Sequence, residues 1–423
     1  MKKKIVIIFR PVIMVKVKYV YCYLFSFLKK LLGGKMLNFN FYNPTQIIFG
    51  KGEMKQLDRL VPKDSRVLIT YGGGSVKKFG TLDMVIDELK KSNREIFEFW
   101  GIEPNPKFET LMKAVKLVRE KKIDFILAVG GGSVMDGTKF IGIASCKDEY
   151  IGREEELLTQ RMISVDKTIP FGTVVTLPAT GSEMNNGGVI SNGEDKLAFF
   201  SKKSFSIFSI LDPELTYTLP KTQVANGIID TFIHVVEQYV TYPVDARFQD
   251  RTAEGILQTL IEVGKETLEN PTNYDARANL VWCATMGLNG LIGAGVPQDW
   301  SVHMIGHELT AIFKIDHAKT LATILPATWK VRKFEKFEKL VQFAERVWDL
   351  REGTDEEKID LAITKTEDFF NSLGMTTKLS DYDVKEDDID KIINSLKSHG
   401  MIKLSERKDQ TLEITRKIIE KAL

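Results

Sequence analysis

The order of strand-like and helical segments constrains the fold of this chain more than any other feature. Between residues 45 and 215, short runs of β-branched and aromatic residues alternate with amphipathic helical patterns. The runs QIIF, RVLITY, IFEFW, FILAVG and GTVVTL begin at residues 46, 66, 96, 125 and 172. This alternation predicts a parallel sheet with helices on both faces.

After Pro220 the strand-like runs stop and helical periodicity continues to Leu423. We therefore expect an α/β dinucleotide-binding domain of residues 36–218 and an all-helical domain of residues 219–423. Within the first domain, residues 187–201 alternate like a β-hairpin with Asn192-Gly193 at its turn. The predicted helices cover residues 76–92, 108–122, 223–240, 249–267, 276–291, 334–350, 356–373 and 412–423.

Residues 1–35 differ in composition from the remainder. They hold nine lysines and arginines and no acidic residue, whereas residues 36–423 hold 50 basic and 57 acidic residues, a net charge of −7. Gly33-Gly34-Lys35-Met36 can be encoded by a ribosome-binding site followed by a start codon. Our hypothesis is that residues 1–35 are a non-native or poorly ordered extension, with a signal or anchor as the alternative. Mass spectrometry of the native N-terminus tests it.

Composition and cysteine usage indicate an ordinary cytoplasmic protein. Hydrophobic residues make up 43% and charged residues 27% of the chain, as in soluble globular proteins. The longest uncharged stretch of the N-terminal segment, residues 19–28, is too short to span a membrane. Cys22, Cys146 and Cys283 fit no disulfide framework or zinc motif, which favours a reducing compartment. We expect neither a nucleic-acid nor a membrane partner.

Two predicted strands end in glycine triplets, TYGGGSVKK from Thr70 and AVGGGSVMDG from Ala128. Glycine allows a sharp turn and a close approach of phosphate to backbone amides, and a helix N-terminus adds partial positive charge. Either cluster alone is typical of a plain tight turn. Two of them at the carboxyl ends of strands in one parallel sheet indicate a nucleotide with its pyrophosphate near residues 130–133.

The first cluster favours NADP(H) over NAD(H). It contains no acidic residue to accept hydrogen bonds from a ribose diol. It offers instead Gly73, Gly74 and Ser75, followed by Lys77 and Lys78, which suit a 2′-phosphate. Alternatively, each lysine is a solvent-facing residue in the first turn of a helix.

All five histidines lie within residues 219–423, and four of them form a candidate metal site. Asp230 and His234 are one helical turn apart on an otherwise apolar face, and Glu237 adds a further carboxylate. His303 and His307 form a second such pair, with His317 close behind. Asp230 and these four histidines are five candidates for about four ligand positions, and spacing leaves open which is spare. Imidazoles with one carboxylate suit Fe²⁺ or Zn²⁺. His399 stands alone in a polar stretch and is left out.

Several long motifs resemble the iron-containing (group III) alcohol dehydrogenases, within them the branch of butanol dehydrogenases and NADPH-dependent broad-range aldehyde reductases. The likeness covers residues 36–423 and includes FNFYNPTQIIFGKG, VGGGSVMDGTKF, LPATGSEMN, QVANGIIDTFIHVVEQYV and GVPQDWSVHMIGHELTAIFKIDHAKTLA. It implies a Rossmann-like α/β domain, an all-helical domain of the dehydroquinate synthase-like architecture, and a homodimer. It also implies hydride transfer between NADP(H) and small aliphatic aldehydes or primary alcohols.

The same resemblance implies a set of site residues. The metal ligands would be Asp230, His234, His303 and His317, and His307 would lie beside the metal near the nicotinamide. NAD-specific relatives often have an aspartate at the position of Gly74. The implied cofactor contacts are Gly73, Gly74, Ser75, Asn105, Gly131, Gly132, Ser133, Asp136, Thr176, Thr180, Asn185, Lys196 and Leu215.

Two other functions fit the same sequence features. One is a glycerol dehydrogenase-like or dehydroquinate synthase-like metal enzyme on the same architecture. The other is a nucleotide-binding metalloprotein without turnover, against which an open coordination position speaks. Oxidation of NADPH by butanal distinguishes an aldehyde reductase from both of these alternatives.

Overall fold

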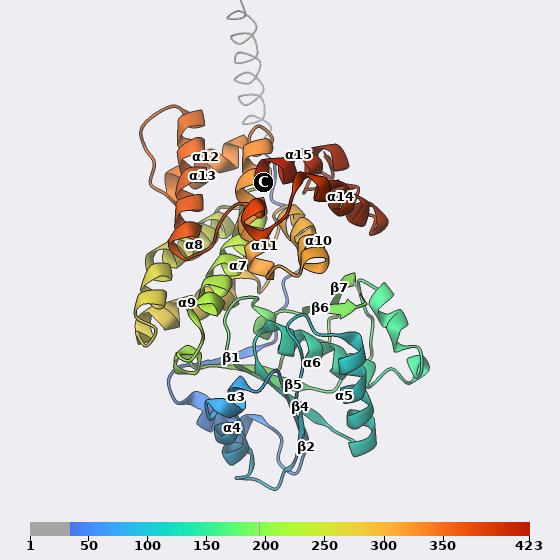
Figure 1. Ribbon diagram of the computed structural model, residues 1–423. Helices are drawn as coiled ribbons and strands as arrows, with labels where there is room; N and C mark the ends of the chain where they lie inside the picture. The colour runs from blue at the N-terminus through green and yellow to red at the C-terminus, as the bar shows by residue number, and fades with distance from the viewer. Residues whose placement is uncertain (1–33, 194) are drawn as a thin grey trace, which may run out of the picture.

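The computed structural model describes residues 34–193 and 195–423, so the expected extension of residues 1–35 lies almost wholly outside the described residues. Figure 1 shows a sheet-containing part below and a helical part above. Within the described residues, a six-stranded, wholly parallel sheet has the order β1-β8-β5-β4-β2-β3. The predicted fold class is confirmed. The strands are β1 (Gln46–Phe49), β2 (Arg66–Tyr71), β3 (Glu95–Phe99), β4 (Phe125–Gly130), β5 (Phe171–Val175) and β8 (Phe208–Leu211).

Helices cover both faces of the sheet because its strands are apolar on both sides. In β4, Ile126 and Ala128 belong to one hydrophobic cluster, and Leu127 and Val129 to the other. Helices α5 and α6 pack on the first face, α4 on the second. The bounds are α2 (Leu57–Leu60), α3 (Ser75–Lys78), α4 (Thr81–Leu89), α5 (Phe108–Lys121) and α6 (Gly132–Ala144).

The structure interrupts one predicted helix, adds one strand and confirms the predicted hairpin. The helix predicted over residues 76–92 is interrupted, because Gly80 adopts a left-handed φ of 79° between α3 and α4. Strand β8 was not predicted, yet it pairs between β5 and β1. The predicted hairpin is confirmed as β6 (Gly187–Asn192) and β7 (Asp195–Phe200). Its turn begins at Gly193 (φ 60°), because Asn192 pairs with Asp195.

The helical part is organised around α7 (Lys221–Tyr239), which contacts α8, α9 and α11 and is buried from Gly227 to Tyr239. None of the described helices combines the length and apolar character needed to cross a bilayer. The other elements are α8 (Arg247–Glu269), α9 (Tyr274–Gly287), α10 (Ser301–Phe313), α11 (His317–Val331), α12 (Phe337–Arg346), α13 (Asp355–Ser372), α14 (Ile389–Ser398), β9 (Lys403–Leu404), β10 (Gln410–Thr411) and α15 (Leu412–Ala422).

Candidate functional site

A cavity of about 1670 Å³ lies where the strand order reverses. From β2 the chain continues to β3 at one edge, and from β4 it continues to β5 in the other direction. Ligands of open α/β sheets bind at the carboxyl ends of the strands beside such a point. Both glycine triplets lie there, at the carboxyl ends of β2 and β4, and the cavity extends from them to α7, α10 and α11.

The cavity brings together most of the residues expected to contact the cofactor. Gly74 and Leu215 are not among its lining residues, and Leu215 packs against the hydrophobic cluster on the α4 face of the sheet. The expected residues that do line it are Gly73, Ser75, Asn105, Gly131, Gly132, Ser133, Asp136, Thr176, Thr180, Asn185 and Lys196.

Glycine is required at the start of α6 by close packing. A Cβ on Gly132 would lie 2.5 Å from Thr180 Oγ1, and one on Gly131 would lie 3.0 Å from Leu177 Cβ. Gly131 and Gly132 line the cavity and bring no side chain of their own to the start of α6. Amides at a helix N-terminus bind anionic groups well.

A buried lysine fixes the floor of the cavity, and sequence reasoning did not identify it. Lys139 Nζ donates to Ser182 Oγ (2.7 Å), Asn185 Oδ1 (2.9 Å) and Gly187 O (2.7 Å). Asp136 accepts from Ser182 Oγ (2.6 Å) and from the amide of Val189 (2.9 Å). Burial lowers the pKa of Lys139 to about 8, although Asp136 opposes the shift. The network ties α6 to the start of the β6–β7 hairpin.

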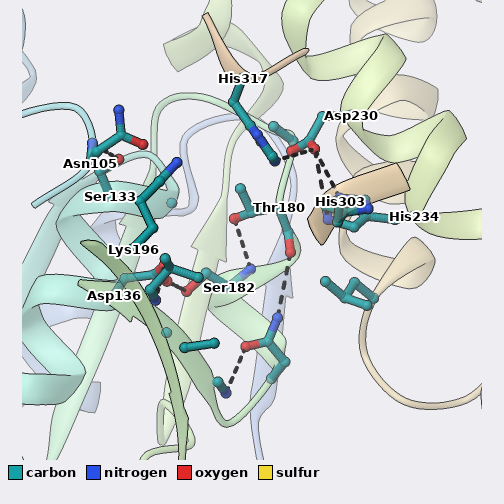
Figure 2. Close-up of a pocket in the computed structure, with 18 of the residues that line it drawn as sticks. Asn105, Ser133, Asp136, Thr180, Ser182, Lys196, Asp230, His234, His303 and His317 are labelled. Atoms are coloured by element: carbon teal, nitrogen blue, oxygen red, sulfur yellow. Dashed lines mark hydrogen bonds and ion pairs between the residues drawn. The ribbon is translucent and has the colours of Figure 1, made fainter. Parts of the chain in front are cut away.

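On the opposite wall, one carboxylate oxygen faces three imidazoles, as Figure 2 shows. Asp230 Oδ1 lies 3.7 Å from His234 Nε2, 3.8 Å from His303 Nε2 and 3.9 Å from His317 Nε2. These separations are too long for hydrogen bonds. They fit atoms that each bind a shared ion at about 2.0–2.2 Å. Within the described residues, Asp230 Oδ1 and His303 Nε2 are buried without a hydrogen-bond partner, and ligand atoms of Asp230, His303 and His317 all lie within 4.8 Å of one another.

The helices reach this geometry through two glycines. A Cβ on Gly306 would lie 2.8 Å from both Leu321 Cδ2 and Thr320 Oγ1, so glycine allows α10 and α11 to touch near His317. A Cβ on Gly227 would lie 2.3 Å from Pro178 O, so α7 sits directly on the loop after β5. The second contact sets the position of Asp230, one turn further along α7, relative to the sheet.

Burial and neighbouring charges shift the pKa values of the four histidines in different directions. Burial lowers the pKa of His234 to about 4 against the attraction of Asp230. Burial also acts on His303, but Glu237 and Asp230 outweigh it and raise the pKa of His303 to about 9. The pKa values of His307 and His317 are well below the ordinary value because of burial and the positive charge of Lys196. The ring centroids of His307 and His317 are 5.0 Å apart.

Two further residues of the cavity lining were not found from the sequence. His399 lies between the two parts of the chain, with Nδ1 2.8 Å from Glu308 Oε1 and Nε2 2.9 Å from Asp195 Oδ1. Trp300 packs edge-on against the His303 ring, with centroids 5.4 Å apart. The sequence around His399 does not indicate its role, because its partners Glu308 and Asp195 are distant in the chain.

Fold and site together define an enzyme with an α/β part and a helical part. The edge of the sheet where nucleotides bind in such folds faces a cluster of histidines on the helices. Residues 44–213 match the family described as iron-containing alcohol dehydrogenase, and residues 224–422 match its C-terminal region. The chain belongs to the iron-containing alcohol dehydrogenase family. The predicted family and the predicted enzyme class, an alcohol dehydrogenase or aldehyde reductase, are thereby confirmed.

Individual relatives cover nearly the whole chain. The NADPH-dependent aldehyde reductase YqhD of Escherichia coli is 56% identical over 92% of this chain and 100% of its own length. The probable NADH-dependent butanol dehydrogenase 1 of Bacillus subtilis is 40% identical over 86% of this chain and 95% of its own length. The crystal structure of YqhD from E. coli superimposes with a TM-score of 0.89 over 92% of this chain and 100% of that chain, at 55% identity. That of an NADH-dependent butanol dehydrogenase A from Thermotoga maritima has a TM-score of 0.84 over 92% and 99%, at 32% identity.

Proposed function

We propose that this protein is a metal-dependent aldehyde reductase that transfers hydride between NADP(H) and small aliphatic aldehydes or primary alcohols. The observation that carries the proposal is that one cavity joins the glycine-rich strand ends to the histidine cluster. A nucleotide bound along the glycine-rich wall would extend toward Asp230 and His303. The NADPH-dependent aldehyde reductase of E. coli, at 56% identity, supports the same chemistry.

We assign Asp230, His234, His303 and His317 as ligands of one Fe²⁺ or Zn²⁺ ion. The donor set of three imidazoles and one carboxylate suits either metal. The support is the convergence of three Nε2 atoms on Asp230 Oδ1 and the buried, unpartnered state of that oxygen. When bound, the metal supplies Lewis-acid stabilisation of charge on a substrate oxygen, and the cofactor supplies the hydride.

We assign NADP(H) as the preferred cofactor. The wall after β2 offers Gly73 and Ser75 and no carboxylate among these loop residues, which leaves room for a 2′-phosphate. Relatives differ in this respect, since the E. coli aldehyde reductase is NADPH-dependent and the B. subtilis butanol dehydrogenase is described as NADH-dependent. The preference therefore requires a direct comparison of the two cofactors.

His307 is assigned as the group that exchanges a proton with the substrate oxygen. It lines the cavity one helical turn from His303, with ring centroids 6.3 Å apart. Replacing His307 by alanine is expected to keep the metal and lower kcat by about 10²-fold, the usual contribution of a general acid or base. Metal analysis and the pH profile of kcat check this, and loss of metal would make His307 a ligand.

We further propose that residues 36–218 and 219–423 are separate domains, and that the protein is a cytoplasmic homodimer. The division is supported by the two family matches, which meet between residues 213 and 224. Light scattering on the purified protein tests the dimer. Limited proteolysis followed by mass spectrometry tests the domain boundary.

The assay that tests the proposed function uses the purified protein with its metal content measured. NADPH and butanal are mixed with the enzyme, and nicotinamide absorbance is followed. We expect NADPH oxidation that depends on aldehyde, and a slower rate with NADH at equal concentration. A metal-loaded protein that oxidises neither cofactor with any small aldehyde refutes the proposal.

A further inference from the structure

A buried carboxylate outside the proposed ligand set holds the helix that carries His303. Glu237 lies on α7, three residues beyond His234, and is 3% exposed. It accepts hydrogen bonds from the amides of Val302 (2.7 Å) and His303 (3.3 Å), and it is hydrogen-bonded to His303 Nδ1. One side chain therefore contacts both the backbone and the ring of the same histidine.

The first turn of α10 needs this carboxylate because it has no cap of its own. Its N-cap residue is Trp300, which adopts a left-handed φ of 65° and makes no side-chain capping hydrogen bond. The amides of a first helical turn require acceptors, and negative charge there is favourable. Glu237 supplies them for Val302 and His303, and Asp299 Oδ1 accepts from the amide of Ser301 (3.0 Å).

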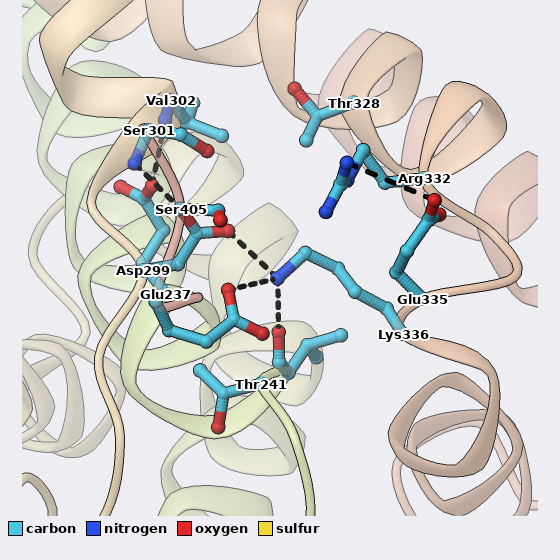
Figure 3. Close-up of polar contacts among 12 residues, drawn as sticks. Glu237, Thr241, Asp299, Ser301, Val302, Thr328, Arg332, Glu335, Lys336 and Ser405 are labelled. Atoms are coloured by element: carbon cyan, nitrogen blue, oxygen red, sulfur yellow. Dashed lines mark hydrogen bonds and ion pairs between the residues drawn. The ribbon is translucent and has the colours of Figure 1, made fainter. Parts of the chain in front are cut away.

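A buried lysine fixes the far side of this arrangement, as Figure 3 shows. Lys336 Nζ lies 2.7 Å from Asp299 Oδ2 and 3.2 Å from Glu406 Oε2, and it donates to Val240 O (2.9 Å). The amide of Asp299 donates to Glu237 O (2.9 Å). Segment 299–303 is thus held at several points, and little freedom remains for the His303 ring.

We propose that Glu237 is a positioning residue for the metal site, which orients His303 by accepting from its Nδ1 so that Nε2 faces Asp230. The inference rests on the proposed metal site. Hydrogen bonds from the second nitrogen of a metal-binding imidazole fix its tautomer and its direction, and their loss typically weakens metal binding by about 10–100-fold. Capping of α10 alone would predict a loss of stability without a specific loss of metal affinity.

The test compares Glu237→Gln with Glu254→Gln. Glutamine keeps the length of the side chain and an oxygen that can accept from Val302, but it replaces the charged partner of the His303 ring by an amide. Glu254 is a matched control because it is 4% exposed and hydrogen-bonded to Tyr239, and it does not line the cavity. Each metal-free protein is titrated with Co²⁺, and affinity and the visible Co²⁺ spectrum are recorded with thermal unfolding.

We expect Glu237→Gln to weaken Co²⁺ binding about 10–100-fold and to change the Co²⁺ spectrum, while Glu254→Gln changes neither. Wild-type affinity and spectrum in Glu237→Gln overturn the inference and leave the proposed function intact. Failure of the wild-type protein to bind Co²⁺ instead refutes the proposed metal site. Should Glu237→Gln not fold, Glu237→Asp, which withdraws the carboxylate by one methylene, is held to the same criterion.

Discussion

The two walls of the cavity are built on opposite principles. The α/β wall presents backbone at the ends of β2 and β4, where both glycine triplets lie, and its Asp136 and the neighbouring Lys139 are held in hydrogen bonds. The helical wall presents side chains: Asp230 Oδ1 and His303 Nε2 are buried without a hydrogen-bond partner among the described residues, and His317 is half-buried. Backbone amides recognise the shape and charge of a phosphate, whereas binding an ion needs donor atoms at set positions. Substitutions on the two walls should therefore have different effects: those on the α/β wall should change cofactor binding, and those on the helical wall should change metal binding.

The largest effect is expected on the helical wall. Asp230→Asn keeps the volume but removes the charge that faces three imidazoles. We expect loss of bound metal and a fall in kcat of about 10³-fold, which corresponds to several kcal/mol of transition-state stabilisation. Metal analysis and steady-state kinetics measure both, with Asp250→Asn, outside the cavity lining, as the control. Full metal content in Asp230→Asn would contradict the ligand assignment.

The next largest effect is expected where the walls meet. Gly227→Ala places a Cβ 2.3 Å from Pro178 O, so α7 must shift away from the loop after β5. We expect a loss of about 1–3 kcal/mol in the free energy of unfolding, together with lower turnover. Denaturant titration measures the first quantity.

Gly255→Ala is the matched control for that substitution. Gly255 lies in α8 with no atom within 4 Å of a built Cβ, so alanine should stabilise the helix by about 0.5–1 kcal/mol. Equal changes in the free energy of unfolding for the two substitutions would show that the close contact with Pro178 does not require glycine at position 227.

A smaller effect is expected on the α/β wall. Lys77 and Lys78 follow Ser75 but are not among the cavity-lining residues. Lys77 Nζ lies 3.4 Å from Glu98 Oε2, whereas Lys78 has no salt bridge among the described residues. If Lys78 contacts the 2′-phosphate, Lys78→Ala should raise KM for NADPH about tenfold, near 1.4 kcal/mol, and leave KM for NADH unchanged. Lys77→Ala should change the ratio of KM for NADPH to KM for NADH less than Lys78→Ala does. Equal changes for both cofactors would remove Lys78 from 2′-phosphate recognition.

The smallest effect is expected at the His399 bridge. Burial lowers its pKa, but hydrogen bonds and charge from Glu308 and Asp195 raise it above the ordinary value overall. Because the folded-state pKa is the higher one, its stabilisation is complete below pH 6.5 and is lost as pH rises through the folded-state pKa. His399→Ala should lower the stability by about 1 kcal/mol or less at pH 6 and by less at pH 9. Thermal unfolding at both values checks this, and an equal loss at both would exclude a charged bridge.

The sequence by itself determined the fold class and the nature of both walls. Strand-helix alternation predicted the parallel sheet, and the glycine triplets predicted the ligand-binding edge, because both signals are local in the chain. Spacing placed Asp230 with His234, and His303 with His307, on shared helical faces. The assignment of ligands among the five candidates came from the family resemblance and stays a prediction.

Only the tertiary structure decided how these local pieces meet. The sequence contains no local signal that Glu237 caps α10, that Lys139 fixes the loop after β5, or that His399 bridges Glu308 and Asp195. Each of these contacts joins residues far apart in the chain. Their distances depend on how closely the helices pack, as at Gly227 and Gly306, and periodicity along one helix does not encode that packing.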